Sequence, residues 1–288
     1  MTVTAPATGR LLRASTRGLR GTGVVGYVCV AVIVVAALIG IFGGVIAPYD
    51  PNAVNLSDSY VGATGGHLLG FDGAGRDLLS RLLVGARTSL LGPLAVVTIS
   101  VLLGTSLAVA TAWLGGWFDS IVSGVLDVLF AFPGILLAVL AAAVFGASLR
   151  SAAIALAVAY TPYVARVLRG AALRERAQQY VAALEVQGIS GVAICVRHLV
   201  PNIGKLIVAQ ATVLFGYAMV DLAAISFIGL GVQPPQPDWG VMVAEGENGV
   251  LQGYPAESLA AGLAIMVVVI AVNLLGERLI DAAQGEQR

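Results

Sequence analysis

The sequence predicts an all-α integral membrane protein with six transmembrane helices. Of its 288 residues, 58% are hydrophobic and 11% are charged, whereas a soluble domain carries about 25% charged residues. The mean hydropathy is +0.91, and several uncharged runs reach the ~20 residues that a helix needs to cross a bilayer. The formal net charge is zero, so we expect no binding of nucleic acid, which requires a basic surface. The expected environment of the chain is a lipid bilayer.

The first predicted span covers residues 24–47 and follows a basic tail, residues 1–23. The tail has no acidic residue and four arginines, namely Arg10, Arg13, Arg17 and Arg20. A basic tail before an apolar run is also typical of a secretory signal, but the core of such a signal has only ~7–15 residues. The longer run here indicates an anchor that the protein retains.

Residues 48–87 are predicted to form an extracytoplasmic loop that ends in a short interfacial helix. The segment is rich in glycine, and Asp50-Pro51-Asn52 is a turn signal. Arg81 and Arg87 are expected at the lipid headgroups. The glycines resemble a phosphate-binding loop only superficially, because no Gly-Lys-Ser/Thr sequence completes them.

The other spans fall within residues 88–282, and residues 283–288 form a charged tail. Runs with few or no charges predict five helices, at 88–118, 120–149, 151–165, 206–231 and 258–276. The short run at 151–165 can cross if flanking arginines extend to the interface. Three aromatic residues are expected in an interfacial belt, namely Trp113, Trp117 and Phe118. Residues 232–257 carry four acidic residues and no basic one, and we expect them to form a second extracytoplasmic loop.

Three polar residues inside the predicted spans are candidates for a translocation path, namely Asp127, Gln210 and Asp221. Asp127 lies six or seven residues into its span, roughly 10 Å inside the membrane at ~1.5 Å per residue. A carboxylate at that depth is costly, so we expect it to pair within the helix bundle or to contact a polar cargo.

The segment 172–202, which we call the mid-chain loop, is charged although apolar spans flank it. It must therefore lie outside the hydrocarbon. Apolar residues from Leu173 to Leu184 recur at steps of three or four and predict an amphipathic helix. Gly188 allows a sharp turn. A second short helix is predicted from Ile189 to about Val200, where Pro201 would stop it because it has no N–H group.

The mid-chain loop resembles the cytoplasmic EAA loop of permease subunits in binding-protein-dependent ABC importers of the dipeptide, oligopeptide and nickel type. The resemblance rests on Gly188 and on His198 ten residues later, followed by Pro201 and Asn202. Where the family has Glu-Ala-Ala, this chain has Ala182-Ala183-Leu184. The segments 67–90 and 226–240 also resemble this family, and specifically its C-type dipeptide permease subunit.

The resemblance implies a type I ABC importer transmembrane domain in a bacterial cell membrane. The mid-chain loop would then dock on an ATPase and transmit its closure to the spans. The loop residues expected at that contact are Ala182, Ala183, Glu185, Gly188, Ile189, Ser190, Arg197, His198, Pro201 and Asn202. The implied partners are a second homologous permease, two ATPase subunits or domains and an extracytoplasmic solute-binding protein. This chain would bind no cofactor, because ATP and Mg²⁺ would be bound by the ATPases. The cargo would be a di- or oligopeptide, with a nickel chelate or another small solute as the alternative.

The distribution of basic residues orients the six spans. Twelve of the 16 lysines and arginines fall in the two tails or in and around the mid-chain loop, and four fall on the other side. Because basic residues favour the cytoplasmic side, both termini and the loop are predicted to be cytoplasmic.

Two other function classes fit the sequence less well. Gly188-Ile189-Ser190-Gly191 with His198 is similar to an intramembrane serine protease motif, but both residues lie in one charged loop instead of on separate buried helices. His67 and His198 are predicted on opposite sides of the membrane, and Cys29 and Cys195 have no metal or disulfide spacing, so we expect free thiols and no metal site.

The alternative to an ABC importer permease is a secondary transporter or channel for a small polar solute. No internal repeat supports this alternative, and it gives the mid-chain loop no purpose.

Overall fold

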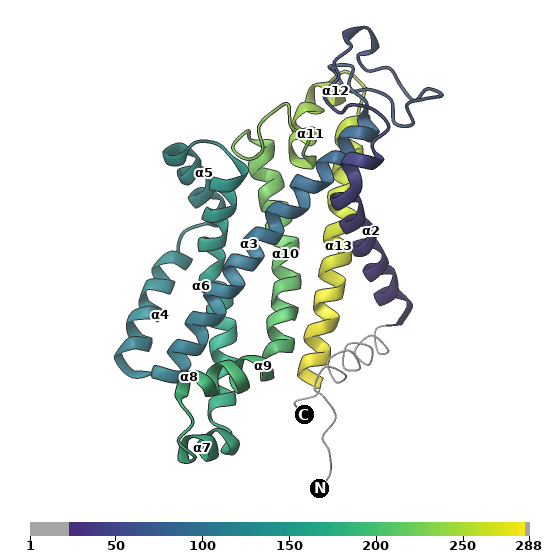
Figure 1. Cartoon of the computed structure of the whole chain (residues 1–288). Coiled ribbons are helices and arrows are strands. Elements are labelled where there is room, and N and C mark those ends of the chain that lie inside the picture. Colours follow the sequence, from purple (N-terminus) through teal and green to yellow (C-terminus); the bar gives the residue numbers. More distant parts are fainter. Residues whose placement is uncertain (1–22, 286–288) are drawn as a thin grey trace.

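The computed structural model describes residues 23–285, and these residues form an all-helical bundle (Figure 1). Five helices are long and apolar enough to cross a membrane, namely α2 (Gly23–Ile46), α3 (Leu78–Leu114), α6 (Leu149–Arg176), α10 (Gly204–Phe227) and α13 (Ala256–Gly285). A bent pair, α4 (Gly116–Phe130) and α5 (Gly134–Phe145), makes the sixth span if it is counted as one. The arginines predicted in the tail 1–23 and the end of the tail 283–288 lie outside the described residues.

Helix α6 is the centre of the bundle. Its buried face is built from small and branched residues such as Ala157, Leu156 and Val164, which pack against α3 and α10. Gly104 of α3 permits the close approach, since a Cβ at this position would lie 2.7 Å from the Val164 side chain. Helices α2 and α13 lie on one side of this core and α4 and α5 on the other (Figure 1).

Helix α3 begins ten residues before the predicted span. Asp77 is its N-cap, and the Asp77 carboxylate accepts a hydrogen bond from the Ser80 N–H at 2.7 Å. The short interfacial helix that we predicted before residue 88 is therefore the start of α3. The prediction that Arg81 lies at the headgroups is wrong, because its side chain is 0% exposed and forms ion pairs inside the protein. Arg87, one and a half turns further along, is exposed.

The span predicted at 120–149 is bent sharply near its middle. Helices α4 and α5 meet at an angle of 83°, with the break at residues 131–133. Pro133 lacks the N–H that a continuous helix needs, and it disfavours helical geometry at the residue before it. The start of α4 also turns sharply, because Gly115 and Gly116 both have positive φ, at 60° and 54°.

One end of the bundle carries what we call the polar cap, residues 48–77 and 228–255 (top of Figure 1). The cap contains two short helices, α11 (Trp239–Glu245) and α12 (Glu247–Leu251), where we predicted only a loop. Tyr60 and Tyr254 stack with ring centroids 5.0 Å apart and join its two segments.

The mid-chain loop lies at the opposite end, as do the start of α2 and the end of α13 (Figure 1). Its first predicted helix is divided: the residues up to Arg176 belong to α6, and α7 (Gln179–Val186) follows. The second half is α8 (Gly191–Ile194), a π-helical turn (Cys195–Leu199) and α9 (Val200–Asn202). Pro201 does not stop this segment, because it occupies the first turn of α9, where a missing N–H costs little.

Candidate functional site

The mid-chain loop is a folded knob with a small apolar core of its own. Val181, Ile194 and Leu199 are buried against Val109 of α3 and Ala172 of α6. These contacts seat the loop on the ends of the two most extensively packed helices, α3 and α6. The knob therefore shares one apolar core with the ends of these two helices.

Gly188 ends α7 in a Schellman motif. Its N–H donates to the Glu185 carbonyl at 2.9 Å, and the N–H of Ile189 donates to the Leu184 carbonyl at 3.2 Å. Gly188 has φ +76°, and a Cβ added at this position would meet no atom within 4 Å. The glycine is needed for its backbone conformation and not for space.

Side-chain hydrogen bonds close the loop on itself. The Glu175 carboxylate accepts from the Tyr180 hydroxyl at 2.6 Å and from the Asn202 amide at 2.7 Å. Burial and the hydrogen bond to Glu175 raise the pKa of Tyr180 to about 12. Asn202, predicted as a partner contact, therefore also fastens the end of the loop to its beginning.

Trp113, which we predicted in an interfacial belt, lies beneath the loop. The Arg176 guanidinium lies 4.9 Å from the centroid of the Trp113 ring and donates to the carbonyls of Ala112 and Trp113. A cation at these last carbonyls of α3 is favourable because they carry partial negative charge. Gly191 of α8 packs against the same indole ring, since a Cβ at this position would lie 2.5 Å from Nε1 of Trp113.

The loop surface holds most of the residues predicted to contact a partner. Exposed among them are Ala182, Ala183, Glu185, Gly188, Ser190, Arg197, Pro201 and Asn202, whereas Ile189 and His198 are half-buried. Sequence reasoning missed three exposed apolar side chains of the loop, Val186, Val192 and Val196. Large exposed apolar side chains on a protruding segment favour contact with another protein.

Ser190 and His198 have structural roles in the loop. The Ser190 hydroxyl is the N-cap of α8 and accepts from the Ala193 N–H at 3.4 Å. The His198 ring lies 6.3 Å from the Tyr180 ring. This arrangement gives neither residue the serine–histidine contact that a nucleophile requires.

The three translocation-path candidates do not form one site. Asp127 on α4 accepts a hydrogen bond from Arg166 at 2.5 Å, and Asp221 on α10 accepts one from Tyr160 at 2.5 Å. Gln210 is buried in α10, and its side-chain oxygen has no partner within the described part of the chain. Each carboxylate is thus paired with a side chain of α6.

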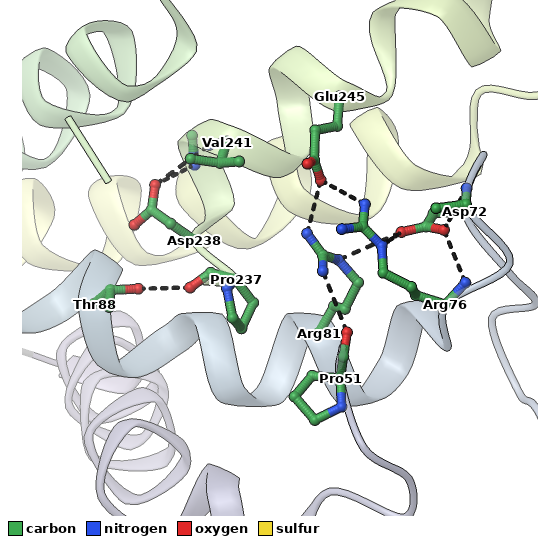
Figure 2. Close-up of polar contacts among 11 residues, drawn as sticks. Pro51, Asp72, Arg76, Arg81, Thr88, Pro237, Asp238, Val241 and Glu245 are labelled. Carbon is green, nitrogen blue, oxygen red and sulfur yellow. Dashed lines mark hydrogen bonds and ion pairs between the residues drawn. The ribbon is translucent and has the colours of Figure 1, made fainter. Parts of the chain in front are cut away.

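The polar cap contains a buried ion cluster that sequence reasoning missed (Figure 2). Arg76 bridges Asp72 at 2.5 Å and Glu245 at 2.8 Å, and Arg81 donates to Glu245 at 2.7 Å and to the Pro51 carbonyl at 3.2 Å. Glu245 is 164 residues from Arg81 in the chain, so no local pattern could indicate the cluster. The ion pairs join the first cap segment to α3 and α11.

A second set of contacts fastens α11 to α3 beside this cluster (Figure 2). Asp238 caps α11 by accepting from the Gly240 and Val241 N–H groups, and it also accepts from the Ser89 hydroxyl at 2.7 Å. Burial raises the pKa of Asp238, although these hydrogen bonds oppose the shift. The Thr88 hydroxyl donates to the Pro237 carbonyl at 2.9 Å. The cap is therefore rigidly attached to the bundle.

A bundle of membrane-length helices with a protruding, partly apolar knob at one end and a fixed polar cap at the other defines a multi-span membrane protein. Comparison with known proteins identifies the family. The model of the binding-protein-dependent transport system inner membrane component matches residues 88–284.

Two relatives cover most of the chain. The dipeptide transport system permease protein DppC of Alkalihalophilus pseudofirmus is 36% identical over 245 residues, 85% of this chain and 80% of that protein. The glutathione transport system permease protein GsiD of Escherichia coli is 37% identical over 251 residues, 87% of this chain and 82% of that protein.

The chain therefore belongs to the family of inner membrane components of binding-protein-dependent transport systems, the ABC importer permeases. The family predicted from the mid-chain loop is confirmed, and so is the type I importer fold. The protein is a transport subunit and not an enzyme, and the alternative of a secondary transporter or channel is wrong.

Proposed function

We propose that the mid-chain loop docks on a separate ATPase subunit and transmits its closure to α3 and α6. The observation that carries this proposal is the seating of the knob: its apolar core is continuous with the ends of both helices, while Val186, Val192 and Val196 are exposed. ATP and Mg²⁺ are bound by the ATPase in this scheme, and this chain supplies no cofactor site.

The proposed orientation places the mid-chain loop and both termini in the cytoplasm of a bacterial cell. Twelve basic residues on that side against four on the other support it. The loop then faces the compartment that holds ATP, and the polar cap faces the extracytoplasmic solute-binding protein that delivers cargo.

The proposed cargo is a di- or oligopeptide. The names of the relatives support this class, since one is a dipeptide permease and the other a permease for glutathione. One chain of six spans supplies half of a path, and a second, homologous permease supplies the other half. The complete importer thus contains two permeases, two ATPase subunits or domains and a binding protein.

Purification of the tagged chain from its native membranes in mild detergent tests this composition. We expect an ATPase and a second permease to co-purify with it in stoichiometric amounts. A variant with Val186, Val192 and Val196 changed to serine should lose the ATPase and keep the second permease. A chain that purifies without an ATPase, or a triple variant that retains it, would count against docking through the loop.

A further inference from the structure

Helix α4 is held to the bundle mainly by charged side chains. None of its residues is buried. Asp119 accepts two hydrogen bonds from Arg169, at 2.7 and 2.5 Å, and Asp127 accepts one from Arg166 at 2.5 Å. The two ion pairs join α4 to α6, which runs in the opposite direction beside it (Figure 1).

The Asp127–Arg166 pair lies within the membrane-spanning part of the chain. Arg166 is six residues before Ala172, where the mid-chain loop begins outside the hydrocarbon. At 1.5 Å per residue, Arg166 lies about 9 Å inside the membrane. This depth agrees with the roughly 10 Å expected for Asp127.

At this depth the Asp127–Arg166 pair faces away from the protein interior. The side chains of Arg166 and Asp127 are 57% and 65% exposed, against 36% and 21% for Arg169 and Asp119. A charge inside the hydrocarbon is costly, so charged groups at this depth face water or other protein groups. The exposed pair therefore marks a side of α4 and α6 that does not face lipid.

A cavity of about 140 Å³ lies beside the pair. Five of its lining residues are polar, namely Asp127, Arg166, Arg169, Thr111 and Ser123, and three are apolar, namely Leu126, Pro162 and Ala165. Since a water occupies ~30 Å³ in the liquid, the cavity has room for several waters. The cavity and the exposed ion pair both indicate an aqueous path along this side of the two helices.

We propose that Asp127 and Arg166 form a charged cargo contact on this path, which takes the ammonium and carboxylate groups of a zwitterionic peptide. The proposal rests on the peptide-importer function proposed above. When no cargo is present, each charge neutralises the other. A passing peptide exchanges with the pair, its carboxylate binding the Arg166 guanidinium and its ammonium binding Asp127.

The neighbouring groups suit the two ion pairs to different roles. The Arg166 guanidinium lies 4.7 Å from the centroid of the Phe130 ring, and this cation–π contact stabilises it when Asp127 turns to the cargo. Asp119 and Arg169 are less exposed and share two hydrogen bonds. The second pair therefore remains closed and holds α4 in place.

Cysteine labelling tests whether the site contacts water and cargo. The probe is a cationic, water-soluble methanethiosulfonate, applied to the reconstituted importer with Asp127→Cys. The native Cys29 and Cys195 are buried, so the unsubstituted importer gives the background. We expect rapid labelling that alanyl-alanine, delivered by the binding protein, slows at least threefold. Val128→Cys, one residue further round the helix, is the matched control whose labelling rate the peptide leaves unchanged.

Uptake of radiolabelled alanyl-alanine into proteoliposomes gives the second readout. Asp127→Asn and Arg166→Gln should each lower ATP-driven uptake about tenfold, while the importer stays assembled. Full uptake by both variants, or labelling of the Asp127→Cys variant at a rate that the peptide does not change, would overturn the cargo contact alone. If the unsubstituted importer takes up no peptide with ATP, the proposed cargo is wrong, and the cargo contact falls with it.

Discussion

The mid-chain loop and the polar cap are folded segments at opposite ends of one bundle, and they are built differently (Figure 1). The loop closes on itself through contacts local in sequence, and the longest side-chain hydrogen bond between two of its residues joins Asn202 to Glu175, 27 residues apart. The cap closes through ion pairs between residues more than 160 apart, around an Arg81 that is fully buried.

This difference indicates that the loop and the cap have different roles, contact with another protein for the loop and stability for the cap. Three charged residues of the loop, Arg174, Glu185 and Arg197, are exposed together with its valines at 186, 192 and 196, and another protein can contact them there. At the cap, Asp72, Arg76, Arg81 and Glu245 instead pair with one another inside the chain and join α3, α11 and the first cap segment. Substitutions in the cap should therefore act on stability, and substitutions on the loop surface should act on coupling.

The largest expected effect is that of Arg81→Ala. It leaves the buried carboxylates of Asp72 and Glu245 short of a cation, which should lower the free energy of unfolding by about 3–5 kcal/mol. Thermal unfolding in detergent measures the change. Arg87→Ala, at an exposed position on the same helix, is the control and should change stability by less than about 0.5 kcal/mol. Equal shifts for the two variants would contradict the structural role of the ion cluster.

Alanine substitution of one glycine with positive φ in the cap and one in the loop tests the same comparison between the two segments. Gly75 has φ +72° in the cap, and a Cβ there would lie 1.8 Å from the Asn55 carbonyl oxygen, whereas the same atom at Gly188 meets open space. Gly188→Ala should cost only the left-handed conformation, about 1–2 kcal/mol. Gly75→Ala should cost about 1–3 kcal/mol more because the backbone must shift. Thermal unfolding of the two variants shows which loses more stability. A larger loss of stability for Gly188→Ala than for Gly75→Ala would contradict this prediction.

A smaller effect is expected from Tyr180→Phe. The change removes the hydroxyl that donates to Glu175 and accepts from Asn202, so the closed loop should lose about 1 kcal/mol. Hydrogen exchange of the loop amides should become faster while that of α3 does not change. Tyr27→Phe, at an exposed position on α2, is the control; similar exchange in the two variants would show that this hydrogen bond does not hold the loop.

Arg197→Glu should have the smallest effect on stability. Arg197 is exposed, so the free energy of unfolding should change by less than about 0.5 kcal/mol. Peptide uptake should nevertheless fall several-fold, because the reversed charge lies on the proposed ATPase contact surface. Arg197→Lys keeps the charge and should retain uptake. Normal uptake by the charge-reversed variant would remove Arg197 from that surface.

Sequence patterns correctly predicted the structural features that are set by residues close together in the chain. The spans follow from hydropathy, and the turn at Gly188 follows from the freedom of glycine to adopt positive φ. Contacts between distant segments could not be predicted in this way. From the sequence alone, Arg81 was predicted at the lipid headgroups, but in the fold it bonds to the distant Glu245. Trp113 was predicted in an aromatic belt, and its packing against Gly191 of α8 could not be predicted. The break at Pro133 had a signal in the sequence, but proline is also tolerated inside spans, as at Pro93 and Pro162.

Site-specific photo-crosslinking tests the central claim, which is that an ATPase subunit binds the surface of the mid-chain loop. A photoreactive amino acid replaces Val192 on the loop or Val54 on the polar cap, both exposed apolar positions. In native membranes, the Val192 position should crosslink to the ATPase subunit, and the Val54 position should not. An ATPase crosslink from Val54, or none from Val192 in an importer that is active, would contradict the claim.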